Sequence, residues 1–165
     1  MTQAELSILL WMQEHMRTDF LDAWLKFISA LGNGGVFWIA LSLLLLCFKK
    51  TRKAGFAAAV ALALMQVSGN MVIKPLVERA RPCDIEHVVE TIDMIIGRPH
   101  GYSFPSGHTA SAFAVVFAFY YVRSWLWKPS LLLAALTAFS RMYLFVHYPT
   151  DIIGGVMLGL VCGWL

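Results

Sequence analysis

Apolar runs alternate with short polar connections along most of this chain, and this pattern predicts helices rather than a sheet. After the N-terminal region the runs cover residues 36–48, 54–73, 109–127, 130–146 and 149–165. The run 54–73 has the length of about 20 residues that a helix needs to cross a bilayer core. We therefore expect an all-α integral membrane bundle of about six helices.

The first 31 residues carry the weakest part of this pattern. Residues 4–16 place apolar side chains among polar ones, as in a helix that lies at the membrane interface or leads into a first span. Residues 20–31 are apolar but short, and they include Asp22 and Lys26. We interpret 4–31 as one broken helical unit, and the sequence leaves open whether it spans the membrane or lies on it.

The longest polar stretch covers residues 74–107, and a loop of this length usually has a function. Its acidic and histidine side chains have no tight metal-ligand spacing, and we interpret them as a solvated cover over a site: Asp84, Glu86, His87, Glu90, Asp93 and His100. The whole chain, 1–165, is expected to form a single domain.

Composition supports the membrane assignment. The chain is 59% hydrophobic and 14% charged, whereas soluble domains carry about 25% charged residues. The net charge of +3 is small, and no basic stripe with interleaved aromatic residues predicts a nucleic-acid partner. Three cysteines without a CxxC pair give no disulfide framework.

The basic residues predict an orientation in a plasma membrane that the chain crosses several times. Lys49, Lys50, Arg52 and Lys53 occupy one connection, and Arg123 and Lys128 occupy another. If the spans alternate, both connections face the cytoplasm, where such residues accumulate. The loop 74–107 then faces the periplasm or the cell exterior.

Three cations, Lys74, Arg81 and Arg141, stand at the ends of apolar runs. One such residue alone is explained by a long side chain reaching the lipid headgroups. Three of them near two histidines also match the needs of a phosphoryl group, because guanidinium groups fit phosphate oxygens and phosphoryl transfer depends on positioning and charge stabilisation.

Ser106, Gly107 and His108 precede the run that begins at residue 109. Backbone N–H groups at a helix start form an anion site, Gly107 allows close approach, and Ser106 adds a hydroxyl. Taken alone, Ser106 is better explained as a simple helix cap.

His147 and Asp151 are four residues apart, so they can meet on one helix face. A carboxylate on one imidazole nitrogen fixes the tautomer and leaves the other nitrogen free to attack phosphorus, while His108 can protonate the leaving oxygen. Each histidine taken alone is better explained as an interfacial hydrogen-bonding residue. A zinc site made of His108, His147 and Asp151 is a rival use, but the three cations would repel a divalent ion. We expect no metal and no cofactor.

Lys-x6-Arg-Pro, Pro-Ser-Gly-His and Ser-Arg-x5-His-x3-Asp occur here in this order between Lys74 and Asp151. Together they resemble the signature of the type 2 phosphatidic acid phosphatase (PAP2) superfamily. The resemblance implies a six-helix membrane phosphatase that needs no metal and shares its core with haloperoxidases. It also implies roles for eight residues: His147 as the nucleophile that becomes phosphohistidine, Asp151 as its orienting partner, His108 as the acid, and Lys74, Arg81, Ser106, Gly107 and Arg141 as the phosphate cradle.

The resemblance implies that the substrate is a lipid phosphate or diphosphate. The other partners that we expect for the protein are the surrounding membrane lipids. An outward-facing site favours undecaprenyl diphosphate, which is released outside after cell-wall polymerisation. Phosphatidylglycerophosphate and phosphatidic acid remain alternatives. A lipid-phosphate transporter or binding protein needs no orienting carboxylate or proton donor, and vanadate-dependent haloperoxidases are soluble, unlike this chain. The oligomeric state is open.

Overall fold

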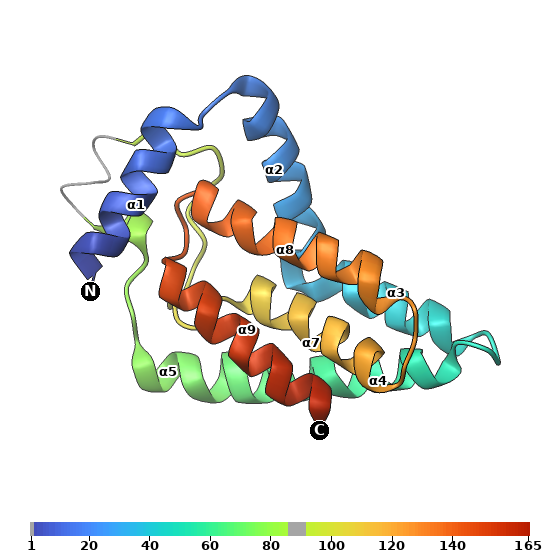
Figure 1. Cartoon of the computed structure of the whole chain (residues 1–165). Coiled ribbons are helices and arrows are strands. Elements are labelled where there is room, and N and C mark those ends of the chain that lie inside the picture. The colour runs from blue at the N-terminus through green and yellow to red at the C-terminus, as the bar shows by residue number, and fades with distance from the viewer. Residues whose placement is uncertain (1, 86–91) are drawn as a thin grey trace.

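A computed structural model describes residues 2–85 and 92–165 (Figure 1). Within these ranges the chain forms helices joined by turns and loops, and no strand. The predicted all-α class is confirmed. Glu86, His87 and Glu90, which we interpreted as part of a solvated cover, lie outside the described residues.

The N-terminal unit consists of two helices, α1 (Thr2–His15) and α2 (Asp19–Leu31). Thr18 separates them, because its extended backbone starts α2 and its hydroxyl accepts the Leu21 N–H at 3.2 Å. A threonine in this position satisfies a backbone donor that the first helical turn leaves unpaired. The break that we expected within 4–31 is therefore a capped start of a second helix.

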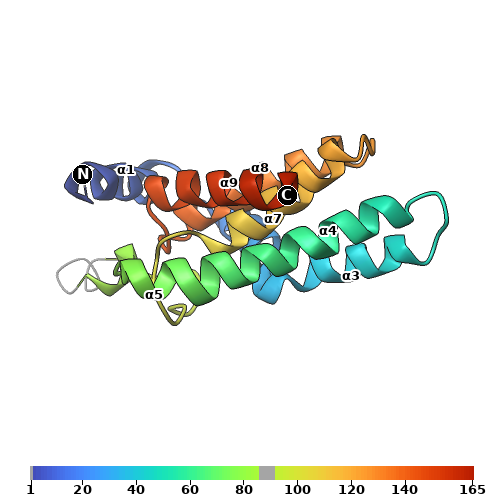
Figure 2. The same cartoon turned by 90° about the horizontal axis from the view of Figure 1, so that it is seen from below.

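The next two helices, α3 (Val36–Leu46) and α4 (Arg52–Met65), run side by side as a hairpin. Before α3 the chain turns through Gly34 and Gly35, whose φ values of 60° and 69° favour glycine. α4 continues through a π-helical segment (Gln66–Ile73) into α5 (Lys74–Val77), and Figure 2 shows the three as one long rod.

This rod begins and ends outside the expected run 54–73. Its last turn contains Lys74, which we had placed at the start of the polar loop. The helix ends where Glu78 adopts a left-handed backbone conformation, with φ of 48°. Lys74 is thus fixed on a helix end and does not belong to a loop. A short 3₁₀ turn (Pro82–Asp84) follows.

The C-terminal helices are α7 (Gly107–Tyr121), α8 (Trp127–Tyr143) and α9 (Pro149–Trp164). α7 lies at the centre and packs against α4, α8 and α9. Gly155, Gly159 and Gly163 follow one face of α9, and a Cβ atom at each of them would come within 3.0 Å of α7. Small residues at this spacing let two helix backbones approach closely, as in membrane bundles.

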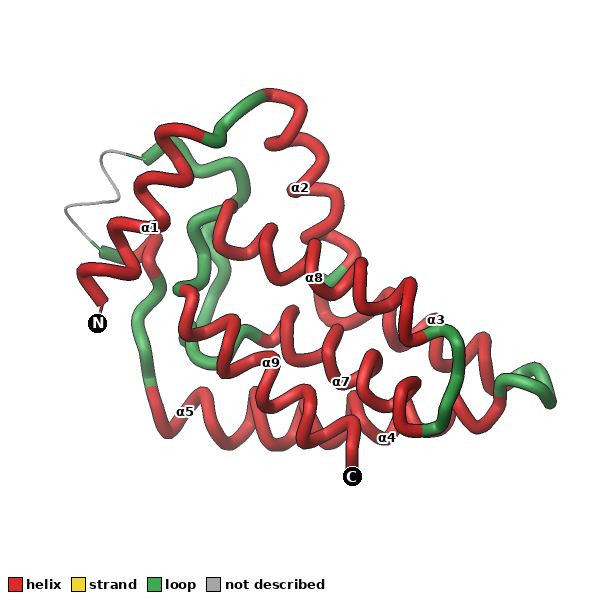
Figure 3. The backbone as a smooth tube through the Cα atoms, in the orientation of Figure 1, coloured by secondary structure: helices red, strands yellow, loops and turns green. Residues whose placement is uncertain are grey.

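Among the residues that the structure describes, length and hydropathy identify one stretch that can cross a bilayer, Arg52–Asp84, which contains the rod and the short turn after it. The pair Asp19–Leu31 and Asn33–Leu46, bent by 44°, qualifies as a second span if it is counted as one, and Pro149–Trp164 is apolar but shorter. Figure 3 shows the long loop after α5 running beside the connection between α8 and α9, where the sequence motifs meet.

Candidate active site

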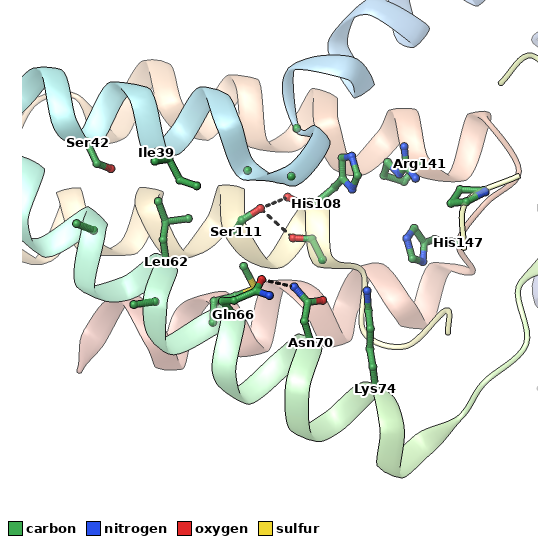
Figure 4. Close-up of a pocket in the computed structure, with 18 of the residues that line it drawn as sticks. Ile39, Ser42, Leu62, Gln66, Asn70, Lys74, His108, Ser111, Arg141 and His147 are labelled. Atoms are coloured by element: carbon green, nitrogen blue, oxygen red, sulfur yellow. Dashed lines mark hydrogen bonds between the residues drawn. The ribbon is translucent and has the colours of Figure 1, made fainter. Parts of the chain in front are cut away.

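The three sequence motifs converge at one end of a single cavity of about 710 Å³ (Figure 4). Their side chains come from the start of α5, the loop after it, the start of α7, the end of α8 and the turn before α9. The motif residues that line the cavity are Lys74, Arg81, Gly107, His108, Arg141 and His147. Ser106 and Asp151 are buried completely beneath them.

His147 lies in the turn between α8 and α9 with its two ring nitrogens in different surroundings. Nδ1 is 3.4 Å from Oδ2 of Asp151, and Nε2 is 3.3 Å from Nη1 of Arg81. The same Asp151 oxygen accepts the Tyr148 N–H at 2.8 Å and the Ser103 hydroxyl. Asp151 is therefore held in place, and Nε2 is the nitrogen directed toward the cationic end of the cavity.

Burial lowers the pKa of His147 to about 4. The hydrogen bond with Asp151 raises this pKa in part, while Arg141 and Arg81 lower it further. The imidazole is consequently neutral at pH 7, with a lone pair available for attack.

The two arginines are almost fully buried. Arg81 donates from Nε to the Gly101 carbonyl at 2.8 Å and from Nη1 to the Val146 carbonyl at 3.1 Å. Arg141 donates from Nη1 to the Ser29 hydroxyl, while its buried Nε has no partner in the described part of the chain. Because buried donors are rarely left unpaired, this N–H indicates a place for an anion.

The start of α7 closes the site from another side. Ser106 is the helix cap, since its Oγ accepts the Thr109 N–H at 3.5 Å. A Cβ atom at position 107 would lie 3.3 Å from Oδ1 of Asn70 and 3.5 Å from Nζ of Lys74, so glycine keeps this corner open. His108 pairs through Nε2 with Oδ1 of Asn33 at 3.0 Å.

Sequence reasoning missed a second set of contacts behind Asp151. Arg79 donates to Oδ1 of Asp151 at 2.6 Å and to Oε2 of Glu5 at 2.8 Å. Oε1 of Glu5 accepts the backbone N–H and the hydroxyl of Thr150, and the Arg79 guanidinium lies 4.1 Å from the ring centre of Tyr148. The proximity of Arg79 to Arg81 in the first motif was an available signal, whereas nothing in the sequence connects Glu5 to residues 150 and 151.

Across residues 2–85 and 92–165, no three His, Cys, Asp or Glu side chains gather into a group that could hold a metal ion. The zinc alternative therefore finds no ligand set in these ranges. Arg81, Arg141 and Lys74 give the cavity end a positive charge instead, which suits an anionic group.

A family model described as the PAP2 superfamily matches residues 50–165. This chain belongs to the PAP2 superfamily. The match includes all three motifs, and the resemblance that we based on them is confirmed.

Curated PAP2 relatives act on different lipid phosphates. An undecaprenyl-diphosphatase from Sulfolobus acidocaldarius is 34% identical over 141 residues, which are 84% of this chain and 66% of the relative. A lipid A 4'-phosphatase from Bacteroides thetaiotaomicron is 32% identical over 153 residues, 86% of this chain and 68% of the relative. This chain thus spans about two thirds of the length of both relatives.

The fold is also that of a solved PAP2 structure. The transmembrane PAP2 type phosphatidylglycerolphosphate phosphatase from Bacillus subtilis superposes with a TM-score of 0.80 at 26% identity, over 99% of this chain and 82% of that chain. The names of these three proteins share one chemistry, removal of a phosphate from a lipid, and differ in the lipid.

Proposed function

We propose that this PAP2 protein is a metal-independent membrane phosphohydrolase that converts undecaprenyl diphosphate to undecaprenyl phosphate. One observation carries the proposal: a single cavity joins the cationic end, where His147 is backed by Asp151, to an apolar section between α3 and α4. Such a cavity suits a phosphate carried on a hydrocarbon chain. The likeness to the undecaprenyl-diphosphatase supports the choice of lipid.

The reaction proceeds in two steps that balance. Nε2 of His147 attacks the terminal phosphorus, a P–N bond forms, and the bond to the bridging oxygen breaks. The leaving oxygen keeps the electron pair and takes a proton from His108. Water then attacks the phosphohistidine, its proton returns to His108, and inorganic phosphate leaves with His147 regenerated.

The surrounding groups stabilise charge and do not take part in bond changes. Arg81, Arg141 and Lys74 face the equatorial oxygens of the transferred group, together with backbone N–H groups at the start of α7. Asp151 stabilises the positive charge that His147 acquires when its Nε2 bonds to phosphorus.

We place the chain as a multi-pass protein of the plasma membrane with this site on the outer side. The turn between α3 and α4 carries Lys49 and Lys50, and the turn between α7 and α8 carries Arg123. Figure 1 shows both turns at the end of the bundle opposite to α1. The separation of basic turns from the cavity supports an outward site.

Phosphatidylglycerophosphate is the second candidate substrate, supported by the likeness to the Bacillus subtilis phosphatase. Lipid A and phosphatidic acid follow the same chemistry. A transporter or binding protein is the alternative from another class, and the neutral, oriented His147 argues against it, because binding alone does not need a nucleophile.

The test is phosphate release by purified protein in detergent from undecaprenyl diphosphate, phosphatidylglycerophosphate and phosphatidic acid, with and without EDTA and with vanadate. We expect the highest kcat/KM on the diphosphate, no effect of EDTA, and inhibition by vanadate, which adopts the five-coordinate shape of phosphoryl transfer. No release from any substrate would favour a binding protein, and loss on chelation that zinc or magnesium restores would contradict the metal-free mechanism.

A further inference from the structure

The cavity has three sections in a fixed order, which Figure 4 shows from one side to the other. Lys74, Arg141 and His147 form the cationic end. Ile39 and Leu62 belong to the apolar end. Between the two ends lies a neutral polar section, lined by Gln66, Asn70 and Ser111. The roles that we assigned from the motifs do not use this middle section.

Two of its residues come from an unusual piece of helix. Gln66 and Asn70 belong to the π-helical segment Gln66–Ile73, inside the stretch Arg52–Asp84 that is long and apolar enough to cross a bilayer. π-helical turns are rare and often occur at functional sites, and polar side chains inside a membrane span are costly. Both side chains line the cavity, one turn apart, in a row that ends at Lys74.

The side-chain amides of Gln66 and Asn70 use only part of their hydrogen-bonding capacity on each other. Nδ2 of Asn70 donates to Oε1 of Gln66 at 2.6 Å. Since each side-chain amide carries two N–H bonds, this contact leaves one N–H of Asn70 and both of Gln66 for another partner. The middle section can therefore donate hydrogen bonds to an acceptor inside the cavity.

The position of Asn70 tells which part of a substrate meets these donors. A Cβ atom at Gly107 would touch both Asn70 and Lys74, so Asn70 lies directly beside the cradle. If a phosphoryl group is held at the cationic end and the lipid tail extends toward the apolar end, the next group along the substrate passes Asn70 first and Gln66 next.

We propose that Asn70 and Gln66, next to Lys74, form a subsite for the inner phosphate of a lipid diphosphate. The proposal rests on the proposed phosphatase function and defines its preferred substrate class. When the bond from the terminal phosphorus to the bridging oxygen breaks, the electron pair stays on the inner phosphate and His108 supplies the proton. Amide N–H groups on the inner phosphate oxygens stabilise this developing charge. A lipid monophosphate releases an alcohol, which has no inner phosphate oxygens to accept these hydrogen bonds. The subsite therefore favours diphosphates over monophosphates.

The test compares two substrates with the same tail, farnesyl diphosphate and farnesyl monophosphate, on the purified protein. In Asn70→Leu and in Gln66→Leu we expect the ratio of kcat/KM for diphosphate over monophosphate to fall by about tenfold. This is the effect expected when one hydrogen bond to a charged group is lost. Ser68→Ala is the matched control, because Ser68 lies in the same segment, donates to the Leu64 carbonyl of its own helix and does not line the cavity.

A second measurement uses two inhibitors that have no lipid tail, so differences in tail binding cannot affect the comparison between them. Inorganic pyrophosphate should inhibit the wild-type protein more strongly than orthophosphate, and Asn70→Leu should remove that advantage. If Asn70→Leu does not fold, Asn70→Asp replaces it, and its negative charge should lower the diphosphate ratio further.

Two results separate the proposals. Wild-type protein that releases phosphate from neither substrate would refute the phosphatase function. Active wild-type protein whose diphosphate ratio is unchanged in the leucine variants, or falls equally in Ser68→Ala, would overturn only the inner-phosphate subsite.

Discussion

His147 is the residue on which the proposed chemistry depends. Its Nδ1 faces Asp151, which Ser103 and the Tyr148 N–H hold in place, and its Nε2 faces Arg81. Of the two ring nitrogens, one is thus occupied by an orienting carboxylate and the other is directed into the cavity. This asymmetry is what a nucleophilic imidazole requires.

We expect His147→Ala to lower turnover by at least about 10⁴-fold, because losing a nucleophile removes the covalent route. The measurement is phosphate release, together with binding of the lipid diphosphate, which should persist because the cations remain. His15→Ala serves as the control, since His15 is exposed on α1. Turnover near that of the control would contradict the phosphohistidine mechanism.

The pKa of His147 is about 4, below the usual value of about 6.5. Between these two values an exposed imidazole gains a proton and His147 stays neutral, so the nucleophilic form should be lost only as the pH falls through about 4. NMR titration of histidine ring nitrogens, with His147→Asn to assign the signal, measures this midpoint. A midpoint near 6.5 would show that burial does not control the group.

Asp151→Asn extends the same test. Asp151 raises the pKa of His147, against the lowering by burial and by the arginines. Removing the carboxylate charge should therefore move the midpoint lower still, and an upward shift would contradict the assignment of Asp151 as the partner.

At the scale of elements, α1 is tied to the site. Glu5 is 7% exposed and connects α1 to Arg79 and to Thr150 at the start of α9. Arg79 in turn contacts Asp151. Arg79 thus links α1, the helix that the sequence left without a role, to the carboxylate that contacts His147.

We expect Glu5→Gln to lower kcat by roughly tenfold with little change in KM, because it weakens a charge-assisted bond that holds Arg79 against Asp151. Arg79→Lys should act in the same direction, since an ammonium lacks the planar fork that reaches both carboxylates. The measurement is the split between kcat and KM on a lipid diphosphate.

Glu14→Gln is the matched control for Glu5→Gln, because the Glu14 side chain lies on the same helix and is 78% exposed. Equal effects of the two substitutions, or a change in KM alone, would remove Glu5 from the positioning of Asp151.

At the scale of the whole molecule, charge is distributed between the two ends of the bundle. Basic residues occupy the α3–α4 and α7–α8 turns, and the cationic end of the cavity is lined from other parts of the chain, by Lys74, Arg81 and Arg141. Cys83, a natural choice for labelling the outer side, is 2% exposed. It would react slowly on either side, so accessibility has to be tested elsewhere.

In a Cys47→Ser background, we expect Asp93→Cys to react with an impermeant thiol reagent on intact cells, because the Asp93 side chain is 96% exposed. Lys50→Cys should react only after permeabilisation, since basic turns stay in the cytoplasm. Mass spectrometry of the purified variants measures the labelling. The reverse pattern would place the site in the cytoplasm and weaken the case for undecaprenyl diphosphate.

The sequence by itself determined the helical class and the PAP2 motifs with their candidate site residues. These features are local: apolar runs of helical length, fixed spacings such as that of His147 and Asp151, and charges at the ends of runs. Each can be recognised without knowing which helices are neighbours, because its physical meaning depends on residues a few positions apart.

Only the tertiary structure decided which distant residues share the site. Glu5 and Thr150 are 145 positions apart, and they meet because α1 lies against the start of α9. In the sequence, Gln66 and Asn70 are only two polar residues within an apolar run. Their shared position on a cavity becomes visible when α3 and α7 are packed beside them. Contacts of this kind arise from packing between helices, and packing joins surfaces that no local spacing connects.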